Sequence, residues 1–198
     1  MKIGLTGGLA SGKSTVSRQL ANAGLVVVDA DELVADLYRN GQPGAAVVRD
    51  LLGQELLDSE GAVDRPRLAA KVFADTDALE RLEQRIHPLV REMFAKIAAA
   101  VSSPIVLEGT LLVEAGYAPD FDLIVTVEAV PETRLERAVA RGLSRQEAQA
   151  RLAAQSDSEL RRRAAHRILH NDGSLEELQE QVDELVELIR KGPEVLRS

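Results

Sequence analysis

The sequence predicts an α/β fold with a mostly parallel five-stranded sheet, and three observations lead to this expectation. Short apolar runs rich in β-branched residues alternate with longer amphipathic stretches of helical period. Several of these runs lack strict alternation of apolar and polar residues, which is typical of strands covered on both faces. A glycine-rich segment joins the first run to the next helical stretch. The expected strands are Ile3–Thr6, Leu25–Asp29, Ile105–Glu108, Leu123–Val127 and Arg167–His170.

Length and composition restrict the function classes. The chain has 198 residues, of which 45% are hydrophobic and 28% charged, and its net charge is −8. We therefore expect one globular domain, or one core with an insertion, and no general nucleic-acid binder, since binding to phosphates needs a basic surface. No apolar run approaches a membrane span, and a motif begins directly at the N-terminus, so we expect no signal peptide and a cytoplasmic enzyme. Because the chain has no Cys and only three His, thiolate catalysis is excluded and a metal cluster is not expected.

Helix starts are marked in the second half of the chain. Ser144-x-x-Glu147 and Ser174-x-x-Glu177 both fit the capping box. The second opens an apolar face that runs to Gly192-Pro193 and predicts a final helix packed on the sheet. The segment between the second and third strands, about residues 32–103, is too long for one crossover helix. We expect a helical insertion there, with a helix break at Pro88.

Residues 7–14 read Gly-Gly-Leu-Ala-Ser-Gly-Lys-Ser and match G-x-x-x-x-G-K-[ST], the Walker A phosphate-binding loop, or P-loop. Gly7 and Gly12 permit a close approach of the backbone to a ligand. The loop amides and the start of the next helix favour phosphate, Lys13 can reach the β- and γ-phosphates, and the Ser14 hydroxyl can ligate Mg²⁺. The predicted strand before the loop and the predicted helix after it supply the setting that this chemistry requires. The sequence therefore predicts nucleoside triphosphate binding.

The P-loop alone leaves open a switch GTPase, an ATPase motor or a small-molecule kinase. The N-K-x-D segment that reads guanine is absent, and the nearest candidate for the acidic strand of a motor is Ile105–Glu108. A kinase needs an acceptor site, and Asp29 and Asp31 are candidates for it. If both lie on the second strand, they share one face of the sheet, where a carboxylate can accept the proton of an acceptor hydroxyl. The alternative is that an Asp caps the following helix.

Arginines after the fourth strand are candidates for phosphate contacts. Arg134, Arg137 and Arg141 are spaced to face similar directions on one helix. Arginines at such a place can neutralise charge on a transferring phosphoryl group. For Arg134 we favour the alternative of a solvated helix with ion pairs, whereas Arg141, next to a glycine, is the better candidate for a lid. The run 161–163, three successive arginines, is interpreted as a solvated face.

At this point the chain resembles the dephospho-CoA kinase family over almost its whole length. The matching segments follow one another in order: Leu5-Thr6-Gly7-Gly8 and Gly12-Lys13-Ser14-Thr15, Asp29-Ala30-Asp31, Gly61, Asp64-Arg65, Leu68, Val72-Phe73, His87-Pro88, Leu111-Leu112, Glu114, Arg137, Arg141, Gln155, Asn171 and Gly173. The chain departs from the family pattern in three places: Thr110 stands where the family usually has Pro, the segment before Ser144 is about one residue shorter than the common lid entrance, and His166 stands where Asp is common.

The resemblance implies transfer of the γ-phosphoryl group of ATP to the ribose 3′-hydroxyl of dephospho-CoA, with Mg²⁺. It implies that Asp31, Lys13 and Arg141 are catalytic, that Ser14 and water hold the metal, and that Asn171 lies near the adenine. The implied ATP-binding residues are Gly7, Gly8, Ala10, Ser11, Gly12, Lys13, Ser14, Thr15, Arg137 and Asn171. The implied substrate-binding residues are Asp31, His87, Leu111 and Glu114.

The expected architecture is a single P-loop kinase domain of the three-layer type, over residues 1–198. Its parts are a core (about 1–31, 104–140 and 165–198), a helical CoA-binding insertion (about 32–103) and a helical lid (about 141–164). The expected partners are small molecules, with no nucleic acid and no membrane, for a monomer or weak homo-oligomer. The competing hypotheses are a kinase for another small metabolite, such as a nucleoside monophosphate, and a nucleotide-dependent regulatory or assembly protein without an acceptor.

Overall fold

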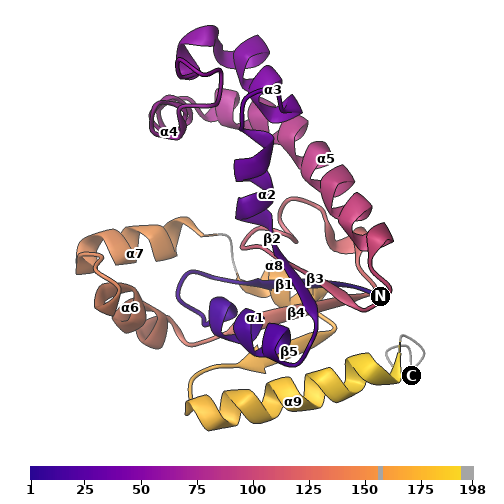
Figure 1. Cartoon of the computed structure of the whole chain (residues 1–198). Helices are drawn as coiled ribbons and strands as arrows, with labels where there is room; N and C mark the ends of the chain where they lie inside the picture. The colour runs from indigo at the N-terminus through magenta and orange to yellow at the C-terminus, as the bar shows by residue number, and fades with distance from the viewer. Residues whose placement is uncertain (156–157, 193–198) are drawn as a thin grey trace. The chain divides into compact units, whose positions relative to one another are not determined.

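The computed structural model (Figure 1) describes residues 1–155 and 158–192, and these form two compact units. The first unit comprises Met1–Val28 and the chain from Val101 onwards, and holds the sheet. The second unit, Asp29–Ala100, is helical. Each unit is described by itself below.

The sheet has the five strands that the sequence predicts, β1 (Lys2–Gly7), β2 (Val26–Asp29), β3 (Ile105–Glu108), β4 (Leu123–Glu128) and β5 (Arg167–His170). The strand order is β2-β3-β1-β4-β5. The pairs β1–β3, β1–β4 and β4–β5 are parallel, with Leu5 of β1 opposite Glu108 of β3 and Val125 of β4. Since all these strands run the same way, their carboxyl ends meet at one edge, where ligands bind in open α/β sheets.

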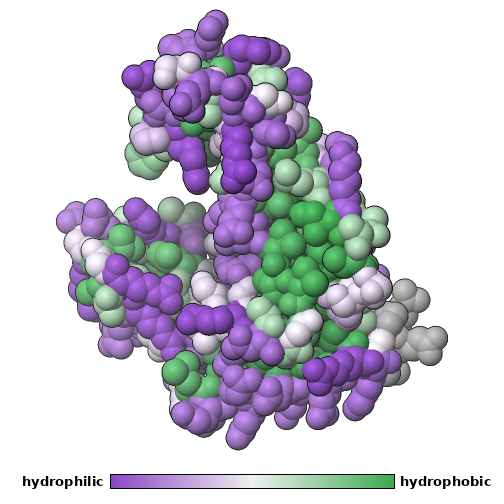
Figure 2. All heavy atoms as spheres, in the orientation of Figure 1, coloured by the Kyte–Doolittle hydropathy of each residue, from purple (hydrophilic) through white to green (hydrophobic). Residues whose placement is uncertain are grey.

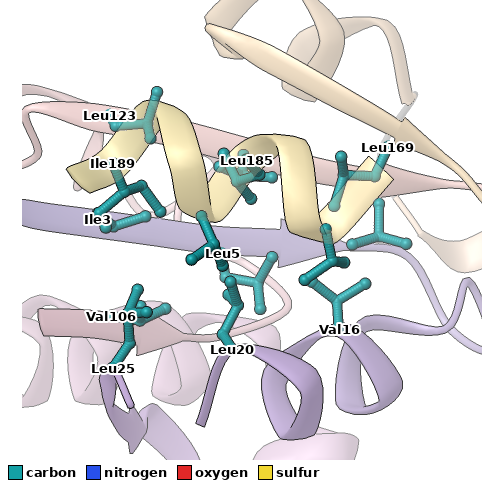
Figure 3. Close-up of a cluster of buried hydrophobic side chains, with 14 of the residues drawn as sticks. Ile3, Leu5, Val16, Leu20, Leu25, Val106, Leu123, Leu169, Leu185 and Ile189 are labelled. Atoms are coloured by element: carbon teal, nitrogen blue, oxygen red, sulfur yellow. The ribbon is translucent and has the colours of Figure 1, made fainter. Parts of the chain in front are cut away.

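One face of the sheet is covered by α1 (Lys13–Asn22) and α9 (Leu175–Lys191), which pack side by side (Figure 1). Alternate residues of β1, Ile3 and Leu5, point into this layer and are fully buried there. Figure 3 shows the resulting cluster, to which each buried aliphatic side chain contributes roughly 1.5–3 kcal/mol of transfer free energy. Its other members are Val16, Leu20, Leu25, Val106, Leu123, Val125, Val127, Leu169, Leu178, Val182, Leu185, Val186 and Ile189.

The opposite face of β1 carries Gly4, and its lack of a side chain has a packing reason. A Cβ atom at Gly4 would lie 2.8 Å from the ring of Phe121, which follows the short 3₁₀ helix η2 (Ala118–Asp120). The helix α8 (Ser158–Ala164) contacts β1 and β4. The sheet is therefore the middle of three layers, as the sequence predicts.

Both predicted capping boxes are present. Ser144 caps α7 (Arg145–Ala154) and Ser174 caps α9, and in each box the glutamate carboxylate accepts from the backbone N–H of the capping serine. The predicted last helix ends at Lys191 and Gly192 follows at a φ of 90°, while Pro193 lies outside the described residues. The outward face of α9 is hydrophilic (Figure 2), as expected for an amphipathic helix covering a sheet.

The second unit consists of α2 (Ala30–Leu37), α3 (Pro43–Leu52), the 3₁₀ helix η1 (Gln54–Leu56), α4 (Arg65–Ala74) and α5 (Thr76–Ala100). The long helix α5 packs against α2, α3 and α4. Its buried side chains recur at helical spacing, namely Leu82, Ile86, Val90 and Phe94. The predicted helical insertion thus has its own core.

The predicted helix break at Pro88 is wrong, because α5 continues through it. Proline removes one hydrogen bond, here to the carbonyl of residue 84. Both Gln84 and Pro88 are exposed, so water can satisfy that carbonyl. The buried residues on either side, Ile86 and Val90, keep the helix in register against its neighbours.

Candidate active site

The phosphate-binding loop occupies the predicted place, between β1 and α1 at the carboxyl edge of the sheet. Ser11 N–H donates to the carbonyl of Gly8, which closes a turn, and the amides of Thr15 and Val16 both donate to Gly12. Gly12 has a φ of 105°, a conformation that favours glycine. Ala10, with a φ of 58°, adopts a left-handed conformation that is rare for a non-glycine residue.

Lys13 is held by Glu108, at the end of the neighbouring strand β3. Lys13 Nζ lies 2.6 Å from Glu108 Oε1, with the two side chains 16% and 10% exposed. The hydroxyl of the buried Ser17, one turn further along α1, donates to the other carboxylate oxygen of Glu108. The strand end that sequence analysis considered only as a motor candidate therefore orients the P-loop lysine. An apolar strand ending in an acid beside the P-loop strand was the available signal.

Asn171 lies against the loop from the far end of β5. Its backbone N–H donates to the carbonyl of Glu128 and its Nδ2 donates to the carbonyl of Ser11 at 2.7 Å. A Cβ atom at Gly12 would lie 1.9 Å from this Nδ2, so only glycine fits beneath Asn171. Arg137 donates to Asn171 Oδ1 at 3.4 Å. Predicted ATP-binding residues from three places in the sequence, the P-loop, Arg137 and Asn171, thus meet at one loop.

The interpretation of Arg134 as part of a solvated helix is wrong. This residue of α6 (Pro131–Ala140) is 9% exposed, and its Nε donates to the carbonyl of Leu9 at 2.9 Å. Burial lowers the pKa of Arg134, with neighbouring Arg161 acting in the same direction, yet a guanidinium stays charged at neutral pH. The i, i+3 spacing placed Arg134 and Arg137 on one face, but it could not show that this face meets the P-loop.

The interpretation of the 161–163 run as a solvated face is wrong for its first member. Arg161 on α8 is 1% exposed and its Nη1 lies 2.7 Å from Glu114 Oε1. Its Nε lies 3.8 Å from the buried carboxylate of Glu128, which also accepts from the hydroxyl of Thr126. Glu114, an expected substrate residue, is therefore engaged with a buried arginine. Arg162 and Arg163 are exposed.

The remaining predicted residues of the first unit lie at the surface. Arg141, at the C-terminal end of α6, is exposed, and Leu111, in the turn after β3, is half exposed. Ser14 at the start of α1 is also exposed, which leaves its hydroxyl accessible.

In the second unit, the two aspartates are not on one strand. The strand β2 ends at Asp29, whose carboxylate accepts from the N–H of Asp31 at 2.7 Å and caps α2. Asp31 lies in the first turn of that helix and is exposed. The expectation of a shared sheet face is thus wrong, because the capping bond starts the helix directly after Asp29. Capping by Asp29 leaves the carboxylate of Asp31 as the better candidate for chemistry.

His87 lines a largely apolar pocket of about 310 Å³ within the helical unit. Polar side chains at its wall come from Tyr38, Arg65 and Glu83. Burial lowers the pKa of His87, outweighing the opposite effect of Glu83, and burial raises the pKa of Tyr38 to about 12. Both groups are therefore neutral at pH 7.

The residues around the loop suit a magnesium ion that is bound mainly through phosphate and water. Among the described residues no group of three or more His, Cys, Asp or Glu could hold a metal. The loop offers the accessible hydroxyl of Ser14 and the buried hydroxyl of Ser11, whose Oγ has no hydrogen-bond partner among the described residues. Mg²⁺ prefers oxygen ligands and commonly keeps several waters instead of binding in an all-protein cage.

Comparisons with known proteins show the family of the chain. The family model for dephospho-CoA kinase matches residues 1–177. A dephospho-CoA kinase of Streptomyces avermitilis is 43% identical over 93% of this chain and 92% of its own length. One from Mycolicibacterium paratuberculosis is 44% identical, and there the match covers 90% of this chain but 44% of the longer relative. Within the part of the chain that the structure describes, no helix is long and apolar enough to cross a membrane.

Solved structures give the same result. The dephospho-CoA kinase of Campylobacter jejuni superposes with a TM-score of 0.72 at 26% identity, over 97% of this chain and 99% of that one. A shikimate kinase of Acinetobacter baumannii, at 15% identity and a TM-score of 0.54 over 96% of this chain and 93% of its own, shares the fold. The chain belongs to the dephospho-CoA kinase family, enzymes that phosphorylate dephospho-CoA with ATP in the last step of coenzyme A biosynthesis.

Proposed function

We propose that this kinase transfers the γ-phosphoryl group of ATP to the ribose 3′-hydroxyl of dephospho-CoA. The observation that carries the proposal is the P-loop at the carboxyl edge of the parallel sheet, with Lys13 oriented over it by Glu108 at 2.6 Å. The loop amides and the start of α1 supply partial positive charge for the triphosphate. When ATP binds, its phosphates compete with Glu108 for the Lys13 ammonium.

Magnesium would be held by Ser14, by phosphate oxygens and by water. The ion supplies neutralisation of the charge that develops on the phosphates. The exposed position of Ser14 at the start of α1 supports this assignment.

Asp31 would accept the proton of the acceptor hydroxyl, or orient it. The different surroundings of the two aspartates support this role, because the carboxylate of Asp29 accepts the capping hydrogen bond of α2 whereas Asp31 is exposed. A carboxylate in this role contributes about 10²–10⁴-fold to the rate.

Arg141 and Arg137 would stabilise the transferring phosphoryl group, with residues 141–164 as a lid that excludes water. Arg137 lies in the last turn of α6, and Arg141 is the C-cap residue four positions later; Arg137 already reaches the loop through Asn171. Water exclusion matters because an open site would transfer phosphate to solvent. The role of Asn171 near the adenine rests on its place beside Gly12.

Dephospho-CoA would bind through the helical insertion, about residues 32–103, with contributions from His87, Leu111 and Glu114. The apolar pocket lined by His87 supports a role in holding the less polar part of the substrate. We propose a cytoplasmic monomer or weak homo-oligomer whose partners are small molecules, since a net charge of −8 disfavours nucleic acid.

The proposal is tested by ADP formation with a panel of acceptors. Purified protein with ATP and Mg²⁺ receives dephospho-CoA, AMP, shikimate or no acceptor. We expect ADP formation to depend on dephospho-CoA. Equal rates with and without that acceptor would instead indicate a nucleotide-dependent regulatory protein, and a preference for AMP would indicate a nucleoside monophosphate kinase.

A further inference from the structure

Two side chains outside the P-loop form hydrogen bonds with the backbone N–H and the carbonyl of Leu9. Gln155 Oε1 accepts from the N–H of Leu9 at 2.9 Å, and Arg134 Nε donates to the carbonyl of Leu9 at 2.9 Å. The two side chains also bond to each other, because Arg134 Nη2 donates to the same Gln155 Oε1 at 2.5 Å. Arg134 comes from α6 and Gln155 follows the end of α7, so a helix pair far along the chain holds the loop.

The loop is shaped to receive this pair. A Cβ atom at Gly8 would lie 2.3 Å from Arg134 Nη2 and 3.0 Å from Gln155 Oε1, so the guanidinium rests directly on the Gly8 backbone. The side chains of the next two residues, Leu9 and Ala10, pack with apolar residues of the same helix pair. These packing partners are Leu135, Ala138, Leu143, Ala148 and Leu152.

The hydrogen bond from Arg134 to the Leu9 carbonyl fixes the direction of one amide of the loop. A trans peptide is planar, and its C=O and N–H point in opposite directions. Arg134 binds the Leu9 carbonyl, and therefore the N–H of Ala10, in the same peptide, points away from Arg134. Ala10 has a φ of 58°, a left-handed conformation that is unfavourable for a residue with a Cβ and persists only where its surroundings enforce it.

We propose that Arg134 and Gln155 are positioning residues of the phosphate-binding loop, which set the Leu9–Ala10 peptide so that the Ala10 amide is aimed at the triphosphate. They act through the loop backbone and touch no phosphate. The inference rests on the proposed function only in that the loop binds ATP. An amide donating to a charged phosphate contributes about 1.5–3 kcal/mol, so its misdirection should weaken MgATP binding roughly ten- to hundredfold.

Substitutions at Gln155 test whether its hydrogen bonds position the loop. Gln155→Leu keeps the approximate size but removes the acceptor, whereas Gln155→Glu keeps an acceptor for Leu9 N–H and pairs with Arg134. We expect Gln155→Leu to raise the equilibrium Kd for MgATP and its KM about tenfold or more, with the KM for dephospho-CoA unchanged within about twofold. Gln155→Glu should stay within about threefold of wild type. Gln149→Leu, at an exposed site on α7, is the matched control.

Arg134→Lys tests the contribution of Arg134 to the same positioning. If Gln155→Leu does not fold, Arg134→Lys alone tests the proposal. Lysine keeps the charge but cannot bond Leu9 and Gln155 together in a planar fork, so the same loss of MgATP affinity is expected. Arg163→Lys, an exposed pair with Glu159, is its control. A purely structural role would lower the Tm without the selective loss of MgATP affinity.

The readout separates this inference from the proposed function. MgATP binding is measured without an acceptor, so the result holds even if dephospho-CoA is not the substrate. Folded Gln155→Leu and Arg134→Lys variants that bind MgATP within about twofold of wild type would overturn the inference.

Discussion

Replacing Lys13 by Ala tests the phosphate-binding site and its link to Glu108 together. In the nucleotide-free protein the substitution leaves the Glu108 carboxylate, 10% exposed, with the Ser17 hydroxyl as its one remaining partner among the residues that the structure describes. Breaking an exposed ion pair costs up to ~1 kcal/mol and breaking a buried one ~3–5 kcal/mol, so this nearly buried pair should cost about 2 kcal/mol. For a chain of this size that corresponds to a Tm lowered by about 4–8 °C.

Turnover should fall for a separate reason. Without the ammonium at the β- and γ-phosphates, we expect a loss of about 10²-fold or more in kcat. The second substitution, Glu108→Gln, removes the unpaired charge. The double variant should therefore regain at least half of the decrease in Tm that Lys13→Ala causes, while it stays inactive. Thermal unfolding followed by circular dichroism gives the first quantity, and a coupled assay of ADP formation gives the second.

Two results would refute this reasoning. A folded Lys13→Ala variant with nearly normal kcat/KM would remove the P-loop from the mechanism. A double variant no more stable than Lys13→Ala would show that the unpaired Glu108 carboxylate is not the source of the lost stability.

Other sites give further predictions. Asp31→Asn should lower kcat about 10²–10⁴-fold with MgATP affinity unchanged, whereas Asp29→Asn, which can still cap α2, should cost little; the reverse ranking in steady-state kinetics would move the base to Asp29. Arg141→Lys should lower kcat about tenfold or more, because an ammonium lacks the planar fork, and an unchanged kcat would make Arg141 a surface residue. Since the folded-state pKa of His87 is lowered, protonation favours the unfolded chain, so its neutral form stabilises the fold above pH ~6.5 and this contribution is lost as the pH falls. The stability of His87→Gln, from urea unfolding, should therefore fall less between pH 7 and 5 than that of wild type, and equal slopes would contradict the assignment.

Sequence reasoning succeeded where the physics is local. The P-loop, both capping boxes and the five strands depend on nearest neighbours and on hydrophobic period, and the structure confirms each. Bounds differ by a residue or two at the strand ends, where hydrogen bonding alone decides, as at Gly7 and Glu128.

Sequence reasoning failed where the partner lies far along the chain. In the sequence, Arg134 and Arg161 resemble ordinary arginines of a helix surface. In the fold, Arg134 binds the carbonyl of Leu9 and Arg161 pairs with Glu114, and both partners are distant in sequence. The grouping of Asp29 with Asp31 failed for a different reason, because a side-chain cap ended the strand at its last residue. In each case a polar contact decided the outcome, and hydrophobic periodicity carries no information about it.

The identity of the accepting hydroxyl tests the central claim most directly. The protein receives MgATP with either dephospho-CoA or its 3′-deoxyribose analogue, and the product is analysed by ³¹P nuclear magnetic resonance and mass spectrometry. The account predicts coenzyme A with a new 3′-phosphomonoester from the first substrate and no phosphorylated product from the second. Phosphorylation of the 3′-deoxy analogue at a rate close to that of dephospho-CoA, or phosphate at any other position of the product, would contradict it.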